Sequence, residues 1–89
     1  MHWLESREVV PTVRAFRDQA ERMRRHEIER ALAAVERGDD PKKVLEQFSQ
    51  ALTNKFLHAP TSTLNQADAA ERALLMRALA RLHRIDPGE

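Results

Sequence analysis

The spacing of proline and glycine sets the length of the first helix that this chain can form. After Pro11, neither residue occurs again until Gly38. Proline suits the first turn of a helix, where its missing N–H costs nothing, and it pushes the preceding Val10 towards an extended conformation. Glycine just beyond a helix readily takes the left-handed conformation that closes it. The pattern therefore predicts a helix from Pro11 to about Arg37, roughly 27 residues or about 40 Å long.

A second helix is predicted after this glycine. Asp40 can cap the free N–H groups of a helix that begins at Pro41 and runs to about His58. Its apolar residues recur at helical spacing, and Pro60 is expected to end it. Because the link between the first two helices is so short, they should lie antiparallel as a hairpin.

A third, shorter helix is predicted near the end of the chain. The segment PTSTLNQA before it is expected to form a loose turn with Leu64 pointing inward. Asp68 followed by Glu71 has the form of a capping box, which opens a helix that runs to about Arg84. Residues 87–89 are expected to fray.

The apolar faces of these helices are too extensive for so short a chain to cover by itself. A chain of 89 residues buries only about 60–65% of the surface that its unfolded form exposes. Because it has no cysteine, self-association is the remaining way to gain stability. We predict an all-α unit of a long helix, an antiparallel second helix and a shorter third helix, which dimerises into a helical bundle. The expected dimer interface consists of Val13, Phe16, Ala20, Met23, Leu74, Ala78 and Leu82.

Each helix of the predicted hairpin carries one charged residue inside its apolar face. Glu27 lies in the middle of the first helix's face, and Lys55 shares a face with Phe48 and Phe56 of the second. Counting outward from the turn leaves Glu27 and Lys55 one turn apart, roughly 6 Å, which a lysine side chain can span. Such a pair adds little stability but can fix the register of helix pairing. Alternatively, both side chains extend to the rim and never meet.

The sequence shows no pattern typical of a catalytic or ligand-binding site. Only two glycines are present, so neither a dinucleotide-binding motif nor a phosphate-binding loop can be formed. A nucleophile paired with a base is also absent from the pattern. We therefore predict no catalytic residue, no cofactor-binding residue and no metal site. No metal-ligand spacing relates the four histidines His2, His26, His58 and His83.

Charge and hydropathy argue against two classes of partner, nucleic acids and membranes. The net charge is +1, and the arginines of the first helix alternate with carboxylates, which favours a solvated helix surface over a phosphate-binding one. No apolar run approaches the ~18 residues that a membrane span requires. The lack of cysteine is typical of a cytoplasmic protein. We expect a cytoplasmic chain that does not bind a membrane.

Two segments, VVPTVRAFRDQAERMRRHEIERAL and LTNKFLHAPTSTL, resemble the C-terminal dimerisation domain of glutamyl-tRNA reductase. The resemblance extends from about Val10 to Ile85, and TNKFLHAPT is its most specific part. We therefore expect the end of a connecting helix or a linker at residues 1–9, a helical dimerisation domain at residues 10–86 and a tail at residues 87–89. We also expect the chain to be part of a larger protein.

The resemblance implies a parent enzyme that uses NADPH to convert glutamyl-tRNA to glutamate-1-semialdehyde, at the start of tetrapyrrole and haem synthesis. It places the catalytic cysteine and the nucleotide-binding domain upstream, so the fragment itself would be a non-catalytic homodimer former. A regulatory protein on its outer face is an additional partner to consider. The alternative hypothesis is a stand-alone helical adaptor that binds a regulatory protein or RNA through the arginine-rich first helix.

Overall fold

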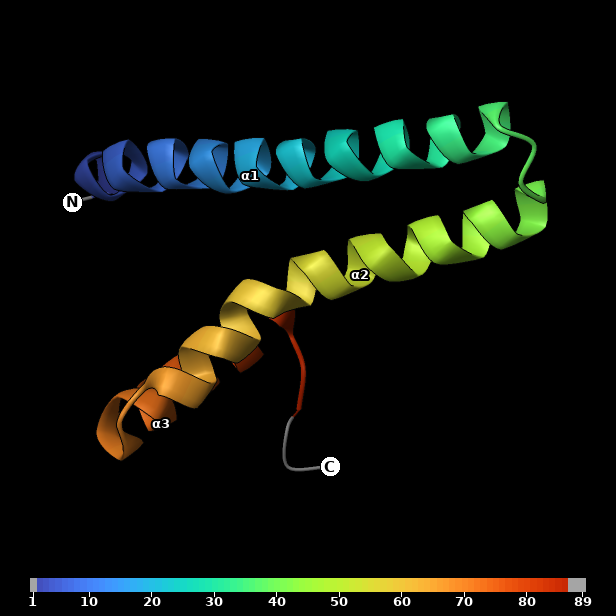
Figure 1. Cartoon of the computed structure of the whole chain (residues 1–89). Coiled ribbons are helices and arrows are strands. Elements are labelled where there is room, and N and C mark those ends of the chain that lie inside the picture. Colours follow the sequence, from blue (N-terminus) through green and yellow to red (C-terminus); the bar gives the residue numbers. More distant parts are fainter. Residues whose placement is uncertain (1, 87–89) are drawn as a thin grey trace. The chain divides into compact units, whose positions relative to one another are not determined.

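The computed structural model describes the backbone of residues 2–86 and the side chains of residues 8–86. These residues form no strand, and the predicted all-α class is confirmed. The predicted tail at residues 87–89 lies outside the described residues. None of the described helices is both long and apolar enough to cross a membrane. The three helices, shown in Figure 1, are α1 (His2–Glu36), α2 (Pro41–Gln66) and α3 (Ala69–His83).

Helix α1 is longer than predicted because it continues through Pro11. It has 35 residues, so the predictions of a helix start at Pro11 and of an extended Val10 were wrong. A proline inside a helix costs about 3 kcal/mol through one lost hydrogen bond and one steric clash. Here Pro11 is exposed, which leaves the backbone around it open to water, and Thr12 Oγ1 donates to the Glu8 carbonyl at 2.8 Å.

The turn between α1 and α2 forms as the sequence predicts. Gly38 has φ +98°, a conformation that side chains with a Cβ rarely adopt, and the N–H of Asp39 donates to the Ala34 carbonyl at 3.0 Å. Asp40 Oδ1 accepts from the N–H of Lys42 at 3.3 Å. The turn joins α1 to residues 41–56 of α2, and these two segments lie antiparallel as a hairpin within the first of two compact units (Figure 1).

Helix α2 also continues through a proline that was expected to end it. It extends past Pro60 to Gln66, so the segment predicted as a loose turn is the last part of α2, with Leu64 half-buried. The second compact unit begins at Leu57 and contains this part of α2 together with α3. Pro60 removes only one helical hydrogen bond, and the end of the helix is stabilised by a residue of α3.

That residue is Arg72, which caps the C-terminus of α2. Its Nε donates to the Leu64 carbonyl at 2.9 Å, and its Nη2 donates to the Ala67 carbonyl at 2.6 Å. The last carbonyls of a helix have no partner within the helix, so a guanidinium can satisfy several at once. The predicted N-cap of α3 is confirmed, because Asp68 Oδ1 accepts from the N–H of Glu71 at 2.9 Å.

Replacing Arg72 with methionine is expected to lower the free energy of unfolding by about 1.5 kcal/mol, because carbonyls that a cation now satisfies would lose their donor. Denaturant unfolding followed by circular dichroism, at one protein concentration, measures the change. Arg77→Met is the matched control, since Arg77 is an exposed cation of the same helix. An equal loss in both variants would show that Arg72 does not stabilise the turn.

Candidate functional site

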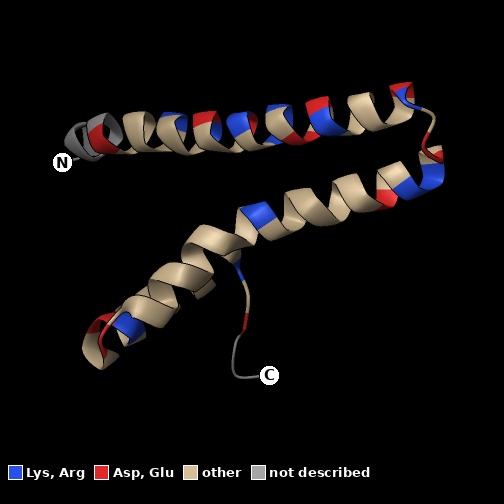
Figure 2. Cartoon of the chain, in the orientation of Figure 1, with Lys and Arg blue, Asp and Glu red and all other residues tan. Residues whose placement is uncertain are grey.

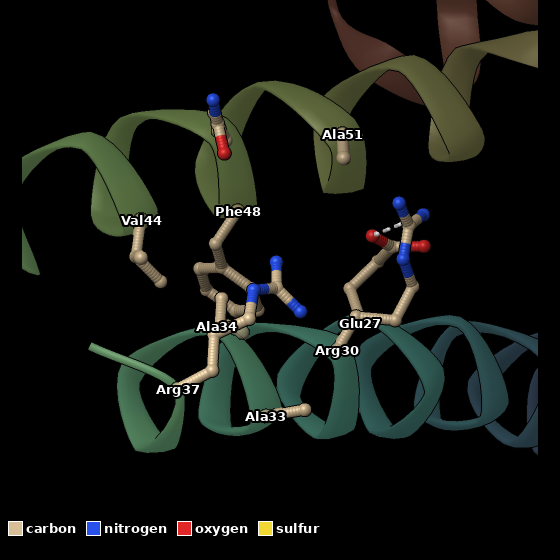
Figure 3. A pocket seen from close by; sticks show the side chains of 10 residues that line it. Glu27, Arg30, Ala33, Ala34, Arg37, Val44, Phe48 and Ala51 are labelled. Atoms are coloured by element: carbon tan, nitrogen blue, oxygen red, sulfur yellow. Dashed lines mark ion pairs between the residues drawn. The ribbon is translucent and has the colours of Figure 1, made fainter. Parts of the chain in front are cut away.

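The interior of the first unit consists of one face of α1 and one face of α2. The inner face of α1 contains Met23, Glu27, Ala31 and Ala34, and the inner face of α2 contains Val44, Phe48, Ala51 and Lys55. Ala34 and Val44 are buried, and Figure 3 shows Val44 and Phe48 pointing from α2 towards α1. Small side chains leave a hollow of about 490 Å³ between the helices. It is lined by Glu27, Arg30, Ala31, Ala33, Ala34, Arg37, Val44, Gln47, Phe48 and Ala51.

An ion pair joins these two inner faces. Lys55 Nζ lies 3.1 Å from Glu27 Oε2, so of the two arrangements that the sequence left open, the structure has the one in which the side chains meet. Glu27 is the one buried charged side chain among residues 8–86, at 3% exposed, whereas Lys55 is 43% exposed. The Oε2 atom of Glu27 is itself fully buried, and the Lys55 ammonium is the cation closest to it.

Two other basic side chains lie near the same carboxylate. Arg30 Nη1 is 3.6 Å from Glu27 Oε1, a pair drawn as a dashed line in Figure 3, and His26 Nε2 is 3.9 Å from Oε2. The Lys55 ammonium, at hydrogen-bonding distance, holds the pKa of Glu27 below its ordinary value, while burial acts in the opposite direction and Arg30 and His26 add to the attraction. Glu27 is therefore charged at neutral pH.

Stability should fall in acid partly because Glu27 loses its charge. Its pKa is lower in the folded chain than the ordinary value of 4.5, so its contribution is complete above that value and is lost as the pH falls through the lower folded pKa. Thermal unfolding from about pH 7 to about pH 3 measures this loss. The Tm of Glu27→Gln should depend less steeply on pH than the wild-type Tm. Equal dependences would contradict the assignment.

The N-terminal half of α1 carries large apolar side chains that remain exposed. The segment of α2 in this unit, residues 41–56, is less than half as long as the 35-residue α1. The rings of Phe16 and Phe56 meet at 6.0 Å, near the end of that segment. Phe16 nevertheless remains about half exposed, and Val9 and Val13, nearer the N-terminus of α1, are exposed as well. We call the surface that consists of Val9, Val13 and Phe16 the α1 stripe.

The predicted interface residues fall into two groups. On α1, Val13 and Phe16 are 48% and 52% exposed, whereas Ala20 and Met23 are half-buried within the hairpin. In the second unit, the predicted residues lie on α3 and form a surface that we call the α3 stripe. Its two leucines, Leu74 and Leu82, are 65% and 78% exposed, and Ala78 is exposed as well. The α3 stripe consists of Leu74, Ala78 and Leu82.

Sequence reasoning missed Val9 as part of the exposed surface because it treated Pro11 as a boundary. Val9, Val13 and Phe16 follow one another at intervals of four and three residues, which places them on one face of a continuous helix. That spacing was the signal that could have found Val9. Further exposed apolar side chains on α2 include Leu45, Phe56 and Leu57.

The charged side chains of α1 do not form a stripe of one sign. Figure 2 shows acidic and basic residues alternating along the helix. Arg24 is paired with Glu21, and Arg25 lies 3.9 Å from the same carboxylate. Carboxylates beside the arginines weaken any attraction for phosphate groups. The surface of α1 is thus better suited to water than to a nucleic acid.

Comparisons with known proteins agree with a surface for self-association. A family model described as "Glutamyl-tRNAGlu reductase, dimerisation domain" matches residues 1–85. Over 87 residues the chain is 52% identical to the glutamyl-tRNA reductase of Thiobacillus denitrificans. The aligned residues make up 98% of this chain and 21% of the relative. The corresponding enzyme of Nitrosomonas europaea is 53% identical over 85 residues, covering 96% of this chain and 20% of the relative. No solved structure matches the chain.

The three helices and their uncovered apolar surfaces thus fall within the class of helical dimerisation domains. The chain belongs to the glutamyl-tRNA reductase dimerisation domain family, as its resemblance indicated. It spans about a fifth of the length of the curated relatives that it matches. These comparisons do not support the alternative of a stand-alone adaptor.

Proposed function

We propose that this chain holds two copies of a glutamyl-tRNA reductase together through the α1 stripe and the α3 stripe. The observation that carries the proposal is the exposure of Val13 and Phe16 in the first compact unit, where the segment of α2 is less than half as long as α1. Water-exposed apolar side chains at regular helical spacing gain free energy when a second helix covers them.

The α3 stripe supports the same proposal independently. Leu74 and Leu82 are more exposed than Val13 and Phe16, although leucine is usually found inside a folded domain. Large exposed apolar side chains that share one helix face are typical of a protein–protein interface. In a symmetric dimer each stripe is used twice, once by each copy.

The activity that we propose for the parent enzyme is the NADPH-dependent conversion of glutamyl-tRNA to glutamate-1-semialdehyde in the cytoplasm. It is supported by the name of the relatives at 52% and 53% identity. The present chain would contribute assembly to this reaction, while catalysis and NADPH binding would depend on other parts of the parent. The charged outer side of α1 would be the surface left for a regulatory protein.

Sedimentation velocity over a concentration series tests the proposed self-association. We expect a reversible step from monomer to dimer, with dimer dominant near ~100 μM, the range in which interfaces of modest size associate. A monomer that persists at this concentration, with helical circular dichroism, would refute self-association by this chain.

A further inference from the structure

The inner faces of α1 and α2 differ in the sign of their single charge. The inner face of α1 carries Glu27, and the inner face of α2 carries Lys55; the other residues of both faces are uncharged. In the hairpin the two charges meet at 3.1 Å. Each inner face is thus neutralised by the other.

Small apolar side chains alone would not restrict the inner faces to this pairing. Ala31, Ala34, Val44 and Ala51 can pack against almost any other helix face of similar size, including the same face of a second copy. Interchangeable contacts of this kind leave register and partner poorly specified. Because a dimer contains two copies of each helix, pairing of α1 with α1, or of α2 with α2, competes with the hairpin.

The charges disfavour both competing arrangements. Pairing of two α1 inner faces would bury two carboxylates without a cation from the opposing face, and a buried uncompensated charge is strongly unfavourable. Pairing of two α2 inner faces would bring two ammonium groups together. The basic side chains of Arg30 and His26 beside Glu27 do not remove this penalty, because they are 69% and 56% exposed and lie at the rim. Only the pairing of α1 with α2 brings opposite charges together.

We infer that Glu27 and Lys55 determine the specificity of self-association. They restrict the inner face of α1 to α2, and the short turn at Gly38 makes that pairing intramolecular. The part of α1 left for a second copy is then the α1 stripe. This inference rests on the proposed function, since it concerns which surfaces two copies use rather than whether they associate.

The test replaces both charges by apolar side chains of similar size, in Glu27→Leu with Lys55→Met. This variant should remain helical, with a Tm at or above that of the wild type, because an apolar pair can replace a buried ion pair without loss. In sedimentation velocity it should nevertheless form several associated species, or a dimer at least about 10-fold tighter than the wild-type dimer. The wild type should show a single reversible step.

The matched control makes the same two chemical changes outside the inner faces, in Glu29→Leu with Lys43→Met, since both residues are exposed. In sedimentation velocity this control should show the same single reversible step from monomer to dimer as the wild type. If the first variant loses its helical circular dichroism, Glu27→Gln with Lys55→Gln removes both charges while keeping polar side chains, and it should show the same additional species.

The inference is overturned if a folded variant without these charges keeps one reversible dimer step with the wild-type affinity, or if the control changes in the same way. A wild-type chain that stays monomeric would instead refute the proposed self-association. The two failures are therefore distinguishable in one series of measurements.

Discussion

Aspartate at both Val13 and Phe16 is expected to weaken self-association by about 100-fold or more, because an interface would have to bury two carboxylates in place of apolar side chains. Both side chains are exposed within their own unit, so the helical content should change little. The dissociation constant from sedimentation, together with circular dichroism of the same samples, separates loss of the dimer from loss of the fold.

The control for this prediction introduces two aspartates on another side of α1. Ala15 and Arg22 are exposed and lie away from the α1 stripe, so Ala15→Asp with Arg22→Asp should dimerise nearly as well as the wild type. If the Val13 and Phe16 variant retains wild-type affinity, the α1 stripe is not part of the interface, and the α3 stripe becomes the surface to test.

Lys55→Met is expected to lower the Tm by about 10 °C, measured at one fixed concentration. Without Lys55, Glu27 would remain almost fully buried and would lose its closest cation. The loss is moderated because solvent reaches Lys55 in the wild type. Lys55→Arg, which retains the positive charge, is the control and should keep most of the wild-type Tm.

The effect of removing Glu27 should be smaller. In Glu27→Leu the remaining lysine is already 43% exposed and can extend further into water. The double variant Glu27→Leu with Lys55→Met should therefore recover all of the Tm lost in Lys55→Met alone. Additive changes in Tm across the two single variants and the double variant would show that the two residues do not act as a pair.

This order of effects is the reverse of the order that the sequence suggests. Sequence periodicity places Lys55 inside the apolar face of its helix, so from the sequence alone we expect removal of Glu27 to be the more damaging change, because it leaves a buried lysine without its counter-charge. The structure places Glu27 inside and Lys55 nearer to solvent. Periodicity shows on which face of a helix a residue lies. The exposure of its side chain also depends on the length of that side chain and on where the covering helix ends.

Local signals predicted the turn and the caps correctly. Gly38 closes the first helix, Asp68 caps the third, and α3 ends at His83, one residue from the predicted end. Each of these features depends on residues within one helical turn of one another, so the sequence pattern contains the necessary information. The short turn also allowed the sequence to place Glu27 and Lys55 within reach of each other, but whether the two side chains meet was left open and is answered by the structure.

The two internal prolines were misjudged because their effect depends on residues further away. At Pro60 the local cost of a lost hydrogen bond is offset at the end of the helix by Arg72, which donates to Leu64, eight residues earlier in the sequence. A rule applied to the residues beside a proline does not include such a contact. The predicted interface on α1 and α3 remains a prediction.

The small number of buried apolar residues makes folding and assembly of this chain parts of one equilibrium. Among residues 8–86, only Ala34, Val44 and Ala67 are buried apolar side chains, and each is small. Ordering the backbone costs about 1–2 kcal/mol for every residue, so an isolated copy has little apolar burial with which to offset that cost. Because the interface adds apolar burial to the little that each copy has, the temperature of melting should rise with protein concentration, and the dimer should unfold at a higher temperature than the isolated copy.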